Sequence, residues 1–90
     1  MEVSDIVLSL CGHDSGSVLF VVGTDGPYVL LADGKRRRVE RPKRKKAKHV
    51  RFLGNSESRT ARKLSECEKV TNNELRRALN EFKESHRQLK

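Results

Sequence analysis

The sequence predicts a mainly β fold, a small five-stranded barrel with an α-helical appendage at its C-terminus. Two observations predict it. Short apolar runs recur over residues 6–53 with turn-forming residues between them, and a helix-capping sequence precedes an apolar stripe over residues 71–89. The 90 residues of the chain leave room for one domain with a core of modest size.

The first three strands are predicted by apolar runs that end in turn residues. Residues 6–10 (IVLSL) alternate with the period of a strand. Residues 18–22 (VLFVV) are too short for a helix and apolar throughout, which predicts a strand buried on much of both faces. Turns are predicted at residues 12–16 and 23–27, and a third strand at residues 28–32 (YVLLA).

A fourth strand is predicted by the dipeptide Asp33-Gly34, which is a strong hairpin signal. The chain would reverse there, and residues 35–39 would pair back on the third strand. Alternation along such a strand places Arg36 and Arg38 on one face and Lys35, Arg37 and Val39 on the other.

The fifth strand closes the predicted barrel. Pro42 ends the fourth strand, because proline cannot donate a hydrogen bond to a ladder. Residues 43–48 are then predicted to form a basic loop. Residues 49–53 (HVRFL) are the predicted closing strand, with Val50 and Phe52 on one side.

The composition changes after the fifth strand, so we predict a barrel over residues 1–54 and a helical segment over residues 55–90. Ser56 is the predicted cap of a weak helix that ends near Leu64, with Glu57 in its first turn.

The main helix is predicted over residues 72 to about 89. Thr71 and Glu74 have the spacing of a capping box, and Val70 and Leu75 that of a hydrophobic staple. One stripe at helical spacing contains Leu75, Ala78, Leu79, Phe82, His86 and Leu89. The barrel is the only candidate surface for this stripe within the chain, and a partner protein is the alternative.

The positive charge of the protein is concentrated in residues 35–51. This segment holds eleven Lys or Arg and a single acid, Glu40, which gives a charge of +10. The remaining 73 residues hold 9 of the 20 basic and 11 of the 12 acidic groups, a charge of −2. Concentrated positive charge is favoured next to a phosphate backbone, where it releases counterions, so the segment is predicted to bind nucleic acid.

Two simpler interpretations of this segment are a disordered polybasic tail and a nuclear-import signal, for which the sequence PKRKK is typical. However, the segment is internal, begins with a hairpin signal and ends in an apolar strand. Its charge also exceeds what a short import signal needs. Binding to a membrane or to an acidic protein stays as an alternative.

Phosphate contact is the predicted binding mode, because none of the four aromatic residues lies within residues 35–51 and base stacking needs aromatic platforms. Such contacts give little base specificity. The arginines of the segment are expected to position the nucleic acid through bidentate contacts, and the lysines to act as point charges. The predicted contact residues are Lys35, Arg36, Arg37, Arg38, Arg41, Lys43, Arg44, Lys45, Lys46, Lys48, His49 and Arg51, with His13 added from the first loop.

No catalytic residue, cofactor or metal site is predicted. The three histidines lie apart from one another and from any nucleophile, and no phosphate-binding glycine loop is present. Cys11 and Cys67 lack ligands at metal-site spacing and are expected to be reduced thiols of a cytoplasmic protein. No apolar run is long enough to cross a membrane, and the acidic start (MEVSD) argues against a secretory signal.

Several of these motifs together resemble the KOW domain. They are the first strand with the loop GHDSG at residues 12–16, the run VLFVV, and ADGKRR at residues 32–37. The similarity is closer to the small bacterial KOW-domain RNA-binding proteins, relatives of KOW-type large-subunit ribosomal proteins of archaea and eukaryotes. The basic loop that starts at Pro42, the following His49 and the sequence VTNNELRRAL at residues 70–79 extend it over nearly the whole chain.

This resemblance implies an SH3-like β-barrel that binds structured RNA in a ribonucleoprotein of translation. Ribosomal RNA is the expected target, and ribosomal proteins are further candidate partners. The first loop of the family commonly carries basic residues, whereas here it carries His13, an aspartate and a serine, so the expected contacts shift to residues 35–51. Two rival functions are a protein-interaction module, as in the KOW domains of NusG-type transcription factors, and DNA binding.

Overall fold

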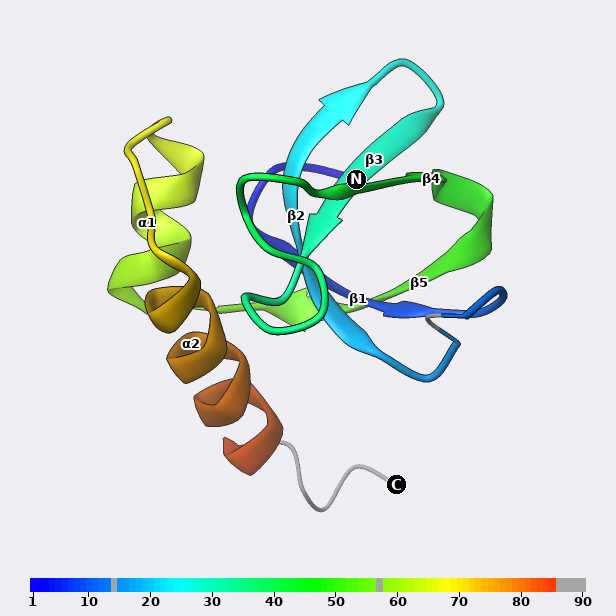
Figure 1. The fold of residues 1–90 in the computed structure, drawn as a ribbon. Helices are drawn as coiled ribbons and strands as arrows, with labels where there is room; N and C mark the ends of the chain where they lie inside the picture. The colour runs from blue at the N-terminus through cyan, green and yellow to red at the C-terminus, as the bar shows by residue number, and fades with distance from the viewer. Residues whose placement is uncertain (14, 57, 86–90) are drawn as a thin grey trace.

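Five antiparallel strands form one sheet in the order β4-β3-β2-β1-β5, and two helices lie against it (Figure 1). The structure is a computed structural model that describes residues 1–13, 15–56 and 58–85. Its elements are β1 (Asp5–Ser9), β2 (Val18–Asp25), β3 (Tyr28–Ala32), β4 (Lys43–Lys46), the 3₁₀ helix η1 (Ala47–His49), β5 (Val50–Asn55), α1 (Arg59–Ser65) and α2 (Asn72–Ser85). The predicted mainly β class and the number of strands are confirmed.

The sheet curls, because its two edge strands are joined by a connection too short for a flat sheet. The edges of a flat five-stranded sheet would lie roughly 19 Å apart. Lys46 ends β4 and Val50 begins β5, with only η1 between them, and four extended residue steps span at most about 14 Å. Lys45 of β4 also reaches β1, which is not its neighbour in the sheet, and donates from Nζ to the Ser9 hydroxyl at 2.7 Å.

One face of the curled sheet encloses an apolar core. The pairs Val7–Leu19 and Val21–Leu31 lie on this face, since residues directly opposite each other in a ladder point to the same side. The buried residues of this inner core are Val7, Leu19, Val21, Val29, Leu31 and Val50.

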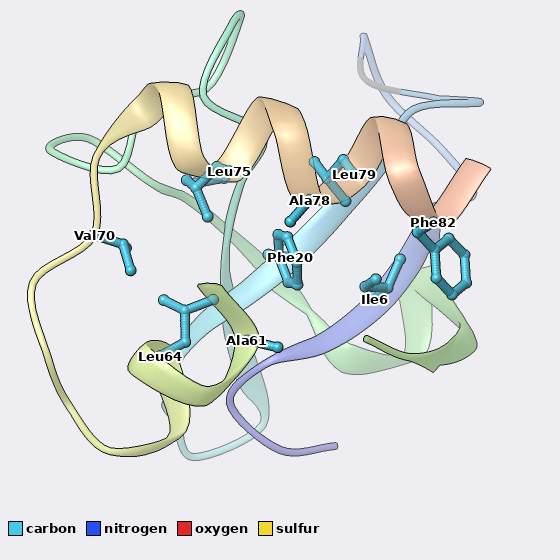
Figure 2. Close-up of a cluster of buried hydrophobic side chains, with 10 residues drawn as sticks. Ile6, Phe20, Ala61, Leu64, Val70, Leu75, Ala78, Leu79 and Phe82 are labelled. Carbon is cyan, nitrogen blue, oxygen red and sulfur yellow. The ribbon is translucent and has the colours of Figure 1, made fainter. Parts of the chain in front are cut away.

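The other face packs against the helices. Ile6, Phe20 and Ala32 are paired across β1, β2 and β3 and form one row on this face. Figure 2 shows α1 and α2 closing over Ile6 and Phe20. The buried residues on the helical side are Ala61 and Leu64 of α1, Val70 of the connection between the helices, and Leu75, Ala78, Leu79 and Phe82 of α2. Because Leu19, Phe20 and Val21 are all buried, the prediction that this strand is covered on both faces is confirmed.

The turn predicted over residues 23–27 is shorter in the structure. Gly23 belongs to β2, where the register of pairing with β3 shifts between Val21 and Gly23. The hairpin therefore turns through only Gly26 and Pro27, and β3 has the predicted bounds.

The predicted fourth strand over residues 35–39 is wrong, and so is the basic loop predicted over residues 43–48. Residues 33–42 form the loop, and β4 pairs with β3 instead. The physical reason lies in Asp33, whose carboxylate accepts the backbone amides of Lys35 and Arg37, both at 2.9 Å. Those amides are then not available to a ladder with β3.

The strand predicted over residues 49–53 is confirmed as β5, although His49 belongs to η1. Val50 pairs with Ser9 and Phe52 pairs with Val7, which places both on one side of the strand, as predicted. However, only Val50 is buried, whereas Phe52 is 53% exposed. β5 is an edge strand, so its outer flank has no neighbour in the sheet.

The first helix is capped by Ser58, not by Ser56 as predicted. The Ser58 hydroxyl accepts the amide of Ala61 at 3.2 Å. Ser56 supports this cap, because its hydroxyl donates to that of Ser58 at 2.7 Å. Glu57, predicted for the first turn, lies outside the described residues.

The capping box of α2 is confirmed. The amide of Glu74 donates to the Thr71 hydroxyl at 3.1 Å, and the amide of Thr71 donates to the Glu74 carboxylate at 3.0 Å. The predicted stripe is buried against the sheet through Leu75, Ala78, Leu79 and Phe82. The part of the stripe predicted at His86 and Leu89 lies outside the described residues.

This capping box predicts a dependence of stability on pH. The Lys63 ammonium, which bonds the Glu74 carboxylate at 2.8 Å, and then the Thr71 amide lower the pKa of Glu74 below the usual 4.5. A lowered pKa in the folded state contributes stability above pH 4.5 that is lost as the pH falls through the folded value. We expect Glu74→Gln to remove this contribution, measured as the urea midpoint over a pH series. Glu81→Gln, on the same helix outside the box, should leave the pH dependence nearly unchanged; an equal effect of both variants would contradict the prediction.

Candidate nucleic-acid interface

Residues 33–42 connect β3 to β4 and carry the first part of the predicted interface. From here on they are called the basic loop, in place of the loop predicted over residues 43–48. The shape of the loop comes from its backbone. Asp33 accepts two amides, as described above, and the Arg37 carbonyl accepts the amides of Asp33 and Gly34 at 2.9 and 3.0 Å. A second turn follows, in which the Arg41 amide donates to the Arg38 carbonyl at 3.0 Å. Backbone bonds and the Asp33 carboxylate therefore set the shape of the loop.

Asn72, at the start of α2, holds the basic loop from outside. Its side-chain oxygen accepts the Val39 amide at 2.7 Å, and its side-chain nitrogen donates to both carboxylate oxygens of Glu40 at 2.9 and 2.7 Å. Glu40 is the only acid within residues 35–51. The one negative group of the segment is thus engaged by the helix.

A second attachment joins Arg76 of α2 to Gly34 of the loop. One terminal guanidinium nitrogen (Nη1) of Arg76 donates to the Gly34 carbonyl at 2.6 Å. Gly34 has a φ of +79°, and a Cβ placed on it would lie 2.2 Å from the Asn72 carbonyl oxygen. Only glycine allows this close packing of the loop on the first turn of the helix. In Figure 1 the loop runs between the strands and α2.

The side chains of the basic loop mostly face solvent. Lys35, Arg36, Arg38 and Arg41 are exposed, and Arg37 is half-buried. The structure therefore brings these five predicted contacts together on one ordered loop. It does not place them as a row along a strand, which is the arrangement predicted from the sequence.

Lys45 is the predicted contact that the structure removes from the surface. It is 8% exposed, and its Nζ donates to the Ser9 hydroxyl and to the Cys11 carbonyl, both at 2.7 Å. Lys45 pairs with Val29, a residue of the inner core, so its side chain points into the curl of the sheet. Its bonds tie β4 to the end of β1 and to the residues that follow it.

Arg44, the neighbouring residue, points outward and is tied to the β2–β3 hairpin. Its guanidinium lies 3.9 Å from the centroid of the Tyr28 ring and 3.3 Å from the Asp25 carboxylate. The side chain is still 56% exposed, so it can reach a phosphate. The Tyr28 ring, in contrast, has one face occupied by Arg44.

The remaining predicted contacts continue away from the basic loop. Lys43 and Lys46 lie on β4, Lys48 and His49 on η1, and Arg51 on β5. Lys46, Lys48 and Arg51 are exposed, whereas Lys43 and His49 are half-buried. His13 is exposed in the separate loop between β1 and β2. The candidate interface thus extends from the basic loop onto β4, η1 and β5.

The described part of the chain offers few groups for other chemistry. Within it, no three His, Cys, Asp or Glu side chains are grouped so that they could hold a metal ion. Cys11 and Cys67 are both exposed, free thiols. No helix in residues 1–85, apart from the two undescribed positions, is long and apolar enough to cross a membrane.

The sequence does not reveal which residues position the basic loop. It predicts a β-hairpin at Gly34 and a helix that contains Asn72 and Arg76. The three residues are brought together by bonds between positions 32 to 42 residues apart, and no local pattern predicts such bonds. Comparison with known proteins adds no further assignment: no protein-family model matches the chain, and no curated protein gives a significant match.

Proposed function

We propose that this protein binds structured RNA through phosphate contacts from the basic loop and from the cations that follow it on β4, η1 and β5. The observation that carries the proposal is an ordered loop with exposed cations, held by backbone bonds and by α2. A loop that is ordered before binding loses less conformational entropy on binding, so it binds more tightly with the same contacts. Ribosomal RNA is the target that the resemblance to KOW-domain proteins suggests.

The same proposal includes an SH3-like barrel. The curl of the sheet supports it, because the edge strands β4 and β5 are joined by three residues and Lys45 links β4 to β1 across the inside. The order β4-β3-β2-β1-β5, with the last strand beside the first, also suits a five-stranded barrel. We infer a binding protein of the translation machinery, not an enzyme.

A protein-interaction module is the main rival, and two observations bear on it. Such a module would use either the stripe of the helix or an edge of the sheet. The stripe is buried against the sheet in the described residues of α2. The edge strand β5 does expose Phe52 and Leu53, at 53% and 36%. Two exposed apolar side chains are a small patch, and isolated ones are common on soluble proteins.

Salt titration tests whether phosphate contacts carry the binding. With about six contacts, the affinity for a folded ribosomal RNA fragment should fall roughly a thousandfold between about 50 and 200 mM salt. Duplex DNA of equal length provides the comparison. Tighter binding to the DNA would favour the DNA-binding rival, and a shallow salt dependence would overturn the phosphate mechanism.

The arginines of the basic loop should account for much of this salt dependence. In the test variant, glutamine replaces each of Arg36, Arg37, Arg38 and Arg41. We expect the slope of log affinity against log salt to become less steep by roughly 3 to 4, and binding to unrelated folded RNAs to weaken alike. The control variant removes the same amount of charge outside residues 35–51. In it, glutamine replaces each of the exposed residues Arg59, Arg62, Lys69 and Arg77. An equal loss in both variants would show that only net charge matters, and a selective loss for one RNA would contradict the positioning role.

A further inference from the structure

A groove next to the basic loop contains cations from outside residues 35–51. It has a volume of about 430 Å³, within the range of small-ligand sites. Three elements line it, and their polar or charged groups are Asp33 and Lys35 of the basic loop and Arg76, Asn80 and Lys83 of α2. Val18, at the start of β2, closes its third side.

The helix presents these groups on one face. Arg76, Asn80 and Lys83 are spaced four and three residues apart, so they lie above one another along α2. Leu79 belongs to the buried stripe and also lines the groove. The packing of α2 on the sheet therefore fixes the positions from which Arg76, Asn80 and Lys83 extend.

The cations of the groove have donors available for a ligand. Arg76 bonds the Gly34 carbonyl and the Asn73 side chain, which uses two of the five N–H groups of a guanidinium. Among the described residues, Lys35 and Lys83 have no side-chain hydrogen-bond or ion-pair partner. Asp33 is the only acid among the described residues of the lining, and its Oδ1 already accepts two amides. Three cations against one carboxylate give these described lining residues a net charge of +2.

We propose that this groove binds a backbone phosphate of the same RNA that the basic loop contacts, with Lys83 and Asn80 of α2 as the contacts that residues 35–51 do not supply. The inference rests on the proposed function and extends the interface onto the helix. Lys35 belongs to both the loop and the groove, so an RNA backbone that follows the loop can continue into the groove. The groove is also open to solvent and its described lining residues carry a net positive charge, which suits a charged backbone better than an apolar ligand.

The test compares two single lysine substitutions with equal loss of charge. Lys83→Gln removes a cation from the groove, and Lys69→Gln removes an exposed cation from the connection between the helices, outside the groove. With the full chain and a folded ribosomal RNA fragment, Lys83→Gln should make the salt slope less steep by about 0.7 to 0.9, the value for one phosphate contact. Lys69→Gln should leave the slope unchanged. Asn80→Ala, which keeps the charge, should weaken RNA binding without an equal change in slope.

Equal effects of Lys83→Gln and Lys69→Gln would overturn the groove as a site. If the variant without the four loop arginines still loses binding in that case, the proposed function stands and only the groove assignment fails. If neither the lysine variants nor the variant without the four loop arginines made the salt slope less steep, the proposed function would be rejected. A separate NMR titration with inorganic phosphate alone identifies the source of the phosphate group. Shifts of the Asn80 side-chain amide at micromolar inorganic phosphate would assign the groove to a free anion and overturn the RNA assignment, whereas shifts only with RNA support it.

Discussion

Replacing Gly34 by alanine should destabilise the protein by roughly 2 to 4 kcal/mol and detach the basic loop from α2. The new Cβ would lie 2.2 Å from the Asn72 carbonyl oxygen and 3.1 Å from the Leu75 Cβ. Neither neighbour can move easily, because the first is backbone in the first turn of α2 and the second is fully buried. The φ of +79° adds backbone strain for any residue with a side chain. Urea denaturation measures the loss of stability.

Gly16→Ala separates the two causes of this effect. Gly16 has a similar φ of +88°, but no atom lies within 4 Å of a Cβ built there. It should therefore show only the backbone cost, about 1 kcal/mol. Under conditions where both variants are folded, Gly34→Ala should also bind RNA more weakly than Gly16→Ala, since its loop has lost the contact with the helix. Equal stability of the two variants would mean that the loop is not packed on α2 as described.

The parts of the fold that the sequence predicts well are those decided by neighbouring residues. The run VLFVV contains its own signal, because a strand covered on both faces needs apolar side chains at consecutive positions. The capping box of Thr71 and Glu74 is likewise complete within four residues. In each case the element forms as predicted, and the structure shows in addition which surface it packs against.

The errors occur where a local signal competes with a bond that the sequence does not reveal. Asp33-Gly34 does reverse the chain, as a hairpin turn would, but the Asp33 carboxylate takes the amides that a following strand would pair. The strand then forms later, at β4, whose residues looked like a loop because all four are cationic. Alternation of apolar and polar residues is the usual signal of a strand, and it fails where a lysine fills the inward position.

For the candidate interface, composition predicts which residues carry charge but not which of them reach solvent. The cluster of cations over residues 35–51 is evident in the sequence, and eleven basic residues in it look alike. Their environments are decided by the pairing of β4 with β3 and by the distant residues Asn72 and Arg76. The sequence does not indicate the cations of α2 as contacts for the same reason, since Lys83 comes near Lys35 only in the folded chain.

Lys45 and Lys46 are adjacent in β4 and carry the same charge, and we expect opposite consequences when each is replaced by alanine. Lys45→Ala should destabilise the protein by about 2 to 4 kcal/mol, because it removes a buried side chain and leaves polar groups of Ser9 and Cys11 without its ammonium. Lys46 is exposed, so Lys46→Ala should change stability by no more than about 0.5 kcal/mol. The free energy of unfolding in urea measures both.

RNA binding should show the reverse order at a temperature where both variants are folded. Lys46→Ala should make the salt slope less steep by about 0.7 to 0.9 if its ammonium contacts a phosphate, and Lys45→Ala should leave the slope unchanged. A lysine whose ammonium is bonded inside the sheet displaces no counterions from RNA. If Lys45→Ala instead lowered the slope without a loss of stability, its ammonium would have to lie at the surface. The bond between β4 and β1, which is one of the supports for the barrel, would then be wrong.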